Sequence, residues 1–239
     1  IEDRILAWRD AHPAWGARKI VRCLEREGLA CPVQSTVHEI LRRHGRIVAP
    51  PGGAAAHLRF EKPEPNQLWQ MDFKGHMPLA GGGRCHPLTV VDDHSRYNLC
   101  LAACADERRN TVQTRLEPTF RRYGLPEAFF VDNGNRWGDS SGERWTKFAV
   151  WLLKLGVAVL PSRPYHPQSR GKNERFHRTL KAEVFALSHF RDLAEVQRAL
   201  DRWRTIYNLE RPHQALDQDV PANRFRPSPR SMPDRLPEV

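Results

Sequence analysis

The 239-residue chain is long enough to bury a core, and its length suits one large domain together with a smaller one. Its 38 Lys and Arg residues outnumber its 28 Asp and Glu residues, and the net charge of +10 favours an anionic polymer or surface as partner. The five cysteines form no CxxC pair, and Lys154 and Gly156 interrupt the longest apolar run. These features argue against a disulfide framework, a zinc ribbon, a membrane span and a signal peptide, so we expect a reduced intracellular protein.

Residues 1–45 are predicted to form three short helices, because apolar side chains recur there at spacings of three and four residues. Thr36 followed by Glu39 has the spacing of a capping box, which predicts the start of the third helix at this point. Three helices with a capped, cationic third one fit a helix-turn-helix module. A plain helical bundle with solvated surface charges is the alternative.

Residues 46–66 are rich in Pro, Gly and Ala without sustained periodicity, which is typical of a linker. From residue 67 the pattern changes to strands. The segment LWQMDF (68–73) alternates apolar and polar residues, as a strand with one packed face requires. LTVVDD (88–93) and YNLCLAACA (97–105) continue an antiparallel run, and three glycines at 81–83 predict a hairpin turn.

Helices and strands are then expected to alternate. The expected elements are a helix at 106–123 ending at Gly124, a buried strand EAFFVD (127–132), a helix near 143–155, a strand VAVLP (157–161) and a long helix from about 168 to 187. This order predicts an α/β fold in which helices flank both faces of a mixed sheet. The core is expected over residues 67–210, with a C-terminal tail over 211–239.

Three carboxylates in this core are candidates for catalysis. Asp72 lies in a strand otherwise made of Trp, Met and Phe, where an acidic residue is disfavoured unless something offsets it. Asp132 ends a buried strand before an Asn-Gly turn, and Glu174 lies on the last long helix among cations. Carboxylates held on rigid elements can bind a pair of Mg²⁺ ions, which activate the attacking oxygen and stabilise the leaving oxygen in phosphodiester chemistry.

Each of these residues also fits a structural role. Asp132 has the sequence context of a turn residue, and Glu174 has the spacing for a helical ion pair with Arg170 or Arg178. Neighbouring polar residues at the end of a strand are interpreted as structural rather than catalytic: Asp92, Asp93 and Ser95.

Several motifs together resemble one family. They are QMDF, VVDDHSRY, VDNG, SRPYHPQSRGKNER and YNLERPHQAL, which cover roughly residues 66–226 in the family's order. On these motifs the chain resembles bacterial insertion-sequence DDE transposases with a retroviral-integrase-like catalytic core. The N-terminal HPAWGARKI and its following helices look like the helix-turn-helix module that precedes such a core.

The resemblance implies an RNase H-like fold with Asp72, Asp132 and Glu174 as the catalytic, metal-binding triad. It implies Mg²⁺ or Mn²⁺ as cofactor, with two ions per active site. The spacing is 60 residues between the first two carboxylates (132 − 72) and 42 between the last two (174 − 132). The second spacing is longer than the family pattern, and the excess falls in NRWGDSSGERW.

The implied activity is cleavage at transposon ends followed by strand transfer. The expected partners are double-stranded DNA, as terminal repeats and as target, and further copies of the chain in a dimer or higher oligomer. We expect a cytoplasmic, nucleoid-associated protein that contacts no membrane. The alternatives are an RNase H-like nuclease that only hydrolyses and a non-catalytic DNA-binding regulator.

The candidate DNA contacts lie in the helical module and around Glu174. In the module they are Gln34, Ser35, His38 and Arg42 for bases and Arg18, Lys19 and Arg43 for phosphates. In the core they are Arg170, Lys172, Asn173, Arg178 and Lys181.

Overall fold

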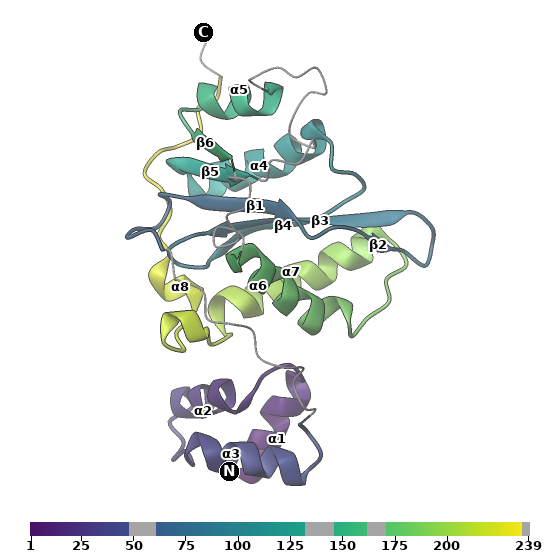
Figure 1. Cartoon of the computed structure of the whole chain (residues 1–239), viewed down its shortest axis with the longest axis vertical. Coiled ribbons are helices and arrows are strands. Elements are labelled where there is room, and N and C mark those ends of the chain that lie inside the picture. Colours follow the sequence, from purple (N-terminus) through teal and green to yellow (C-terminus); the bar gives the residue numbers. More distant parts are fainter. Residues whose placement is uncertain (48–60, 132–145, 162–170, 236–239) are drawn as a thin grey trace.

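The computed structural model describes residues 1–47, 61–131, 146–161 and 171–235. They form a small helical module and a sheet with helices on both faces (Figure 1). Within these ranges, no helix is long and apolar enough to cross a membrane.

The helical module consists of α1 (Glu2–Ala11), α2 (Ala17–Arg26) and α3 (Gln34–Arg43). Its core contains Ile5, Ile20, Leu24, Val37 and Leu41. The predicted capping box at Thr36 is wrong, because α3 begins at Gln34 and has Val33 in the N-cap position without a side-chain cap. Glu39 is engaged elsewhere, since Arg42 Nε donates to its carboxylate at 2.8 Å.

The sheet has an antiparallel half and a parallel half, as shown in Figure 1. Its strands are β1 (Trp69–Phe73), β2 (Met77–Pro78), β3 (Arg84–Asp92), β4 (Asn98–Cys104), β5 (Ala128–Val131) and β6 (Ala158–Pro161). Strand β3 pairs antiparallel with β1, β2 and β4, while β5 pairs parallel with β1 and β6. Strand β1 therefore occupies the centre of the sheet, where its backbone is held on both sides.

Separate helices cover the two faces of the sheet. On one face, α4 (Arg109–Tyr123) and α5 (Lys147–Lys154) pack on a cluster in which the Trp69 ring lies 6.0 Å from Phe120 and 5.8 Å from Phe129. On the other face, α6 (Gly171–Leu180), the π-helical turn η2 (Lys181–Phe185) and α7 (Leu193–Leu209) cover β3 and β4. This arrangement confirms the predicted mixed α/β sheet with helices on both faces.

Helix α7 has no counterpart in the sequence prediction. It buries Val196, Leu200 and Trp203 against β4 and α6. The long helix predicted over 168–187 is α6 followed by η2 where it is described. Residues 168–170 lie outside the described ranges.

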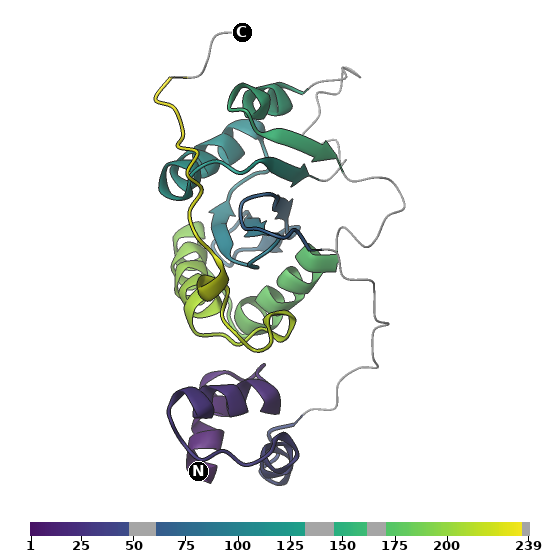
Figure 2. The same cartoon turned by 90° about the vertical axis from the view of Figure 1, so that its left-hand side faces the viewer.

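The expected tail is packed against the core. After η3 (Gln214–Leu216) and α8 (Pro221–Arg224), residues 225–235 form what we call the C-terminal strap, drawn in yellow in Figure 2. The Phe225 ring stacks on Tyr97 at 4.4 Å. The strap also exchanges backbone hydrogen bonds with the end of α4, from Ser228 N to Tyr123 O at 2.8 Å and from Leu125 N to Arg230 O at 2.7 Å.

The end of the expected linker is also part of the core. Asn66 is buried, and its backbone N donates to Asp92 Oδ1 at 2.8 Å. Its side chain accepts from Trp69 Nε1 and donates to the carbonyl of Arg226. Asn66 therefore attaches the segment before β1 to the C-terminal strap.

Replacing Arg230 by Met is expected to lower the free energy of unfolding by about 1.5–3 kcal/mol, the value of hydrogen bonds made by a charged group. Its guanidinium donates to the carbonyls of Pro126 and Gly156, both at 2.6 Å. The matched control is Arg226→Met in the same strap, because the Arg226 ion pair with Glu64 is 73% and 55% exposed. Urea denaturation of both variants measures the difference, and equal losses would contradict the clamping role of Arg230.

Candidate active site

Asp72 lies on the central strand of the sheet and is partly open to solvent. Its neighbours Met71 and Phe73 are buried on the α4 side, as the alternation predicts, while 36% of the Asp72 side chain is exposed. Its backbone carbonyl accepts a hydrogen bond from Thr89 Oγ1 on β3 at 2.9 Å. The strand therefore presents the carboxylate from a backbone that is fixed on both edges.

Glu174 lies in the first turn of α6 and is exposed. The described residues include no ion pair for it, so the interpretation as a pair with Arg178 is not supported. Arg170, the other possible partner, lies outside the described ranges. The helix is anchored by Phe176, whose ring lies 5.5 Å from Trp203 and 5.0 Å from Tyr207. Glu174 thus projects from a firmly packed helix, and its carboxylate pairs with no cation of the described ranges.

His177 connects α6 to β1 and β3. Its Nε2 lies 2.9 Å from Thr89 Oγ1, and its Nδ1 lies 3.9 Å from Asp72 Oδ2. Because the single hydroxyl proton of Thr89 goes to the Asp72 carbonyl, Nε2 is the donor to Thr89. Burial, with Lys74 as the second cause, lowers the pKa of His177 to about 4, so the imidazole is neutral at pH 7.

The sequence analysis did not place His177 in the site. The signal available was its position three residues after Glu174, which puts the two side chains on one helix face. Through His177 the structure brings the helix that carries Glu174 onto the strand that carries Asp72.

Asp132, the third expected carboxylate, lies outside the described ranges. Among the residues that are described, no three Asp, Glu, His or Cys side chains gather closely enough to hold a metal ion. Asp72 and Glu174 nevertheless have suitable chemistry, since carboxylate oxygens are the ligands that Mg²⁺ prefers and Glu174 has no competing cation in the described part of the chain.

The predicted DNA contacts of the helical module lie mostly on its surface. Those on α3 are all exposed: Gln34, Ser35, His38, Arg42 and Arg43. Arg43 pairs with Glu2, and Arg18 Nε donates to Gln34 Oε1 at 3.0 Å. Lys19 is half-buried, and burial, with Arg211 as the second cause, lowers its pKa to about 8.

The predicted contacts around Glu174 divide into two groups. Arg178 and Lys181 are exposed, whereas Asn173 is buried and the ammonium group of Lys172 donates to Asp93. Burial, with Arg96 next in importance, lowers the pKa of Lys172 to about 8. The exposed cations are therefore available to a ligand, and Lys172 is engaged within the protein.

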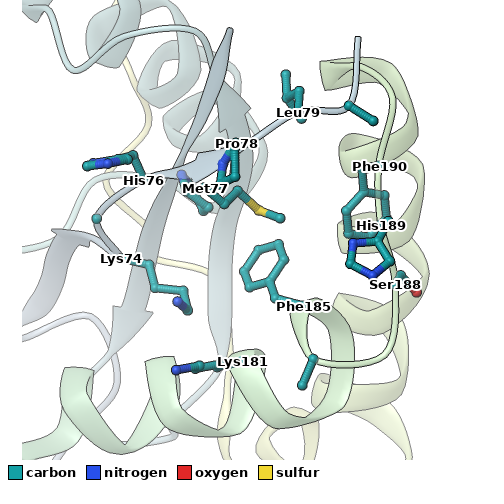
Figure 3. A pocket seen from close by; sticks show the side chains of 14 residues that line it. Lys74, His76, Met77, Pro78, Leu79, Lys181, Phe185, Ser188, His189 and Phe190 are labelled. Atoms are coloured by element: carbon teal, nitrogen blue, oxygen red, sulfur yellow. The ribbon is translucent and has the colours of Figure 1, made fainter. Parts of the chain in front are cut away.

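A hollow of about 510 Å³ lies beside this site, between the segment from β1 to β2 and η2 with the residues that follow it. In Figure 3, Lys74, two residues after Asp72, reaches toward the helix that carries Lys181, seven residues after Glu174, and both side chains lie at one edge of the hollow. Phe185 and Met77 form part of its apolar wall, and Lys74 Nζ lies 5.2 Å from the centre of the Phe185 ring. Lys74 and Lys181 thus add two cations beside the strand and the helix that carry the candidate carboxylates Asp72 and Glu174.

The turn residues of VVDDHSRY have the structural role that we expected. Asp92 and Ser95 are fully buried, and the Asp92 carboxylate accepts from Ser95 N at 2.8 Å and from Ser95 Oγ at 2.6 Å. Burial raises the pKa of Asp92, although these hydrogen bonds oppose the shift. Neither side chain is accessible to substrate.

Comparison with known proteins gives two family matches, both described as integrase core domain, over residues 62–167 and 155–221. Two relatives are each 28% identical over 158 residues, or 66% of this chain. One is an uncharacterized 39.2 kDa protein of insertion element IS476 from Xanthomonas euvesicatoria. The other is an uncharacterized 31.7 kDa protein of insertion element IS407 from Burkholderia multivorans. These matches cover 44% and 54% of the relatives, so the chain spans about half the length of the curated proteins it matches.

Solved structures show the same fold at low sequence identity. The HTLV-2 integrase catalytic core domain in complex with magnesium matches with a TM-score of 0.52 and 14% identity, over 68% of this chain and 97% of that one. The simian T-cell lymphotropic virus intasome matches with a TM-score of 0.57 and 18% identity, over 92% and 75%. These similarities confirm the expected RNase H-like fold.

Proposed function

We propose that this chain, which matches the integrase core domain over residues 62–221, is an insertion-element transposase that cleaves DNA at transposon ends and transfers those ends to target DNA. The observation that carries the proposal is the approach of α6 to β1. It sets the exposed carboxylate of Glu174 one helical turn from His177, which lies 3.9 Å from the Asp72 carboxylate.

We propose that Asp132 completes the site. The described register aligns Trp69 with Phe129 and Gln70 with Phe130 in parallel strands. Asp132 follows Phe130 by two residues, just as Asp72 follows Gln70 by two. This equal offset supports Asp132 as the partner of Asp72, and the chemistry of three carboxylates suits Mg²⁺ or Mn²⁺.

The triad would hold two divalent ions, which when bound activate the attacking hydroxyl and stabilise the leaving oxygen. The residues of the chain itself provide placement. The β1 backbone fixes Asp72, and the packing of Phe176 fixes the helix from which Glu174 projects. His177 donates through Nε2 to Thr89. Its Nδ1, which faces the Asp72 carboxylate, is therefore unprotonated and donates no hydrogen bond to Asp72.

DNA is proposed to follow the exposed cations. Arg178 extends from α6 and Lys181 from η2. The helical module presents α3 to the bases of the terminal repeats, with Arg18, Lys19 and Arg43 directed to phosphates. Arg170 is proposed as a further DNA contact, whereas Lys172, which binds Asp93, and the buried Asn173 are proposed to act by holding α6 in place. Joining two DNA ends in one event requires a dimer or higher oligomer, acting on nucleoid DNA in the bacterial cytoplasm.

The test uses the full chain with duplex oligonucleotides from the DNA that flanks its reading frame. A pre-cut end with a free 3′ hydroxyl should give a strand-transfer product in Mg²⁺ or Mn²⁺ and none in EDTA. Cleavage without any strand-transfer product would instead indicate a nuclease that only hydrolyses. A gel shift with neither reaction would indicate a DNA-binding regulator.

A further inference from the structure

Asp93, the second aspartate of VVDDHSRY, differs from its neighbour in where its partners come from. Both carboxylates are buried, at 0% exposure for Asp92 and 1% for Asp93. Asp92 binds its own turn, through Ser95, and the segment just before β1, through Asn66. Asp93 instead accepts hydrogen bonds from Lys62 N at 2.8 Å, from Gln70 Nε2 at 2.6 Å and from Lys172 Nζ.

Two of these partners lie on the elements that carry the candidate catalytic carboxylates. Gln70 precedes Asp72 by two residues on β1, and Lys172 precedes Glu174 by two residues on α6. Side chains two apart on a strand project from the same face, so Gln70 and Asp72 share a face of the sheet. The Asp93 carboxylate therefore links β1 to the first turn of α6. On each element it binds the residue two positions before the candidate catalytic carboxylate.

Glu174 lies between this attachment and a second one. After Lys172, which binds Asp93, the next attachment of α6 to the antiparallel strands is His177, which binds Thr89. Glu174 lies between these two residues and is exposed, whereas Asn173 and Phe176 on the same helix are buried. Two attachments on one helix fix both its rotation about its axis and its sliding along the sheet, and these are the movements that would change the separation of Glu174 from Asp72.

We propose that Asp93, acting through Lys172 and Gln70, is a positioning residue that sets the separation of Glu174 from Asp72. The inference rests on the proposed function of those two carboxylates. Asp93 itself is 1% exposed, so we assign it no direct contact with DNA. Groups that orient metal-binding side chains typically change metal affinity or turnover by about 10- to 100-fold when they are replaced.

The test compares Asp93→Asn with Asp92→Asn, which makes the same chemical change one residue away at an equally buried carboxylate. Lys172→Met removes the other half of the ion pair while keeping the aliphatic chain, and D93N/K172M removes both charges. Each variant is assayed below its unfolding temperature for strand-transfer turnover at saturating DNA. Mn²⁺ affinity is measured by titration calorimetry without DNA.

Asp93→Asn and Lys172→Met are expected to weaken Mn²⁺ binding or turnover by about 10- to 100-fold. The double variant should be no worse than the worse single one, because the two residues act as one unit. Asp92→Asn should lower the melting temperature while leaving Mn²⁺ affinity and turnover within about threefold of the wild-type values.

The inference is overturned if Asp93→Asn and Lys172→Met change only the melting temperature, as Asp92→Asn does. It is also overturned if Asp92→Asn reduces Mn²⁺ affinity equally. A wild-type chain without strand transfer would instead refute the proposed function, and the ranking of Mn²⁺ affinities would still decide the role of Asp93.

Discussion

Replacing Asp72 by Asn or Glu174 by Gln is expected to reduce strand transfer by at least about 10³-fold. Even a single neutral hydrogen-bond donor to a developing charge contributes about 10²- to 10³-fold, and a carboxylate that holds a metal ion should contribute no less. Both side chains are at least partly exposed, so neither amide should disturb the core. Strand transfer in Mg²⁺ and DNA binding in Ca²⁺ are the two measurements.

DNA binding should persist in both variants, because the exposed cations Arg178 and Lys181 are unchanged. Removing a negative charge beside the phosphate path should leave affinity equal or slightly higher. Glu117→Gln is a suitable control. Glu117 is exposed on α4, and its replacement makes the same chemical change as Glu174→Gln on the opposite side of the sheet. Strand transfer at the wild-type rate in D72N or E174Q would remove that residue from the triad.

Replacing Gly124 by Ala is expected to lower the free energy of unfolding by about 2–6 kcal/mol. Gly124 ends α4 with φ 77° and ψ −176°, a conformation that costs a residue with a Cβ about 1–3 kcal/mol. A Cβ there would lie 2.5 Å from the carbonyl oxygen of Ser228 and 2.9 Å from that of Arg230. The strap would have to move, which adds about 1–3 kcal/mol.

Urea denaturation measures this loss. Gly171→Ala is the matched control, because a Cβ at Gly171 meets nothing within 4 Å and its φ lies outside the left-handed range. That variant should match the wild type or exceed its stability by up to about 1 kcal/mol. If Gly124→Ala is as stable as Gly171→Ala, the strap does not pack on the end of α4 as the structure shows.

The sequence by itself determined the elements whose pattern is local. Asp72 could be assigned to a strand because Trp69, Met71 and Phe73 alternate with it, and Gly124 could be assigned to a helix end because glycine adopts a positive φ without strain. The motif order then indicated the family. Thr36 shows the limit of this approach. Thr36 and Glu39 have the spacing of a capping box, but both lie inside α3, and neither side chain caps its first turn.

Tertiary structure alone decided which distant residues meet. Nothing local marks Asp93 as a link between Gln70 and Lys172, because those three residues are brought together by pairing of β1 with β3 and by docking of α6. The same holds for His177 beside Asp72. It also holds for the strap, whose residues have no periodicity of their own and pack against the end of α4 and against Tyr97, the residue before β4. Local propensity specifies φ and ψ, whereas the placement of buried charges depends on which elements the core brings into contact.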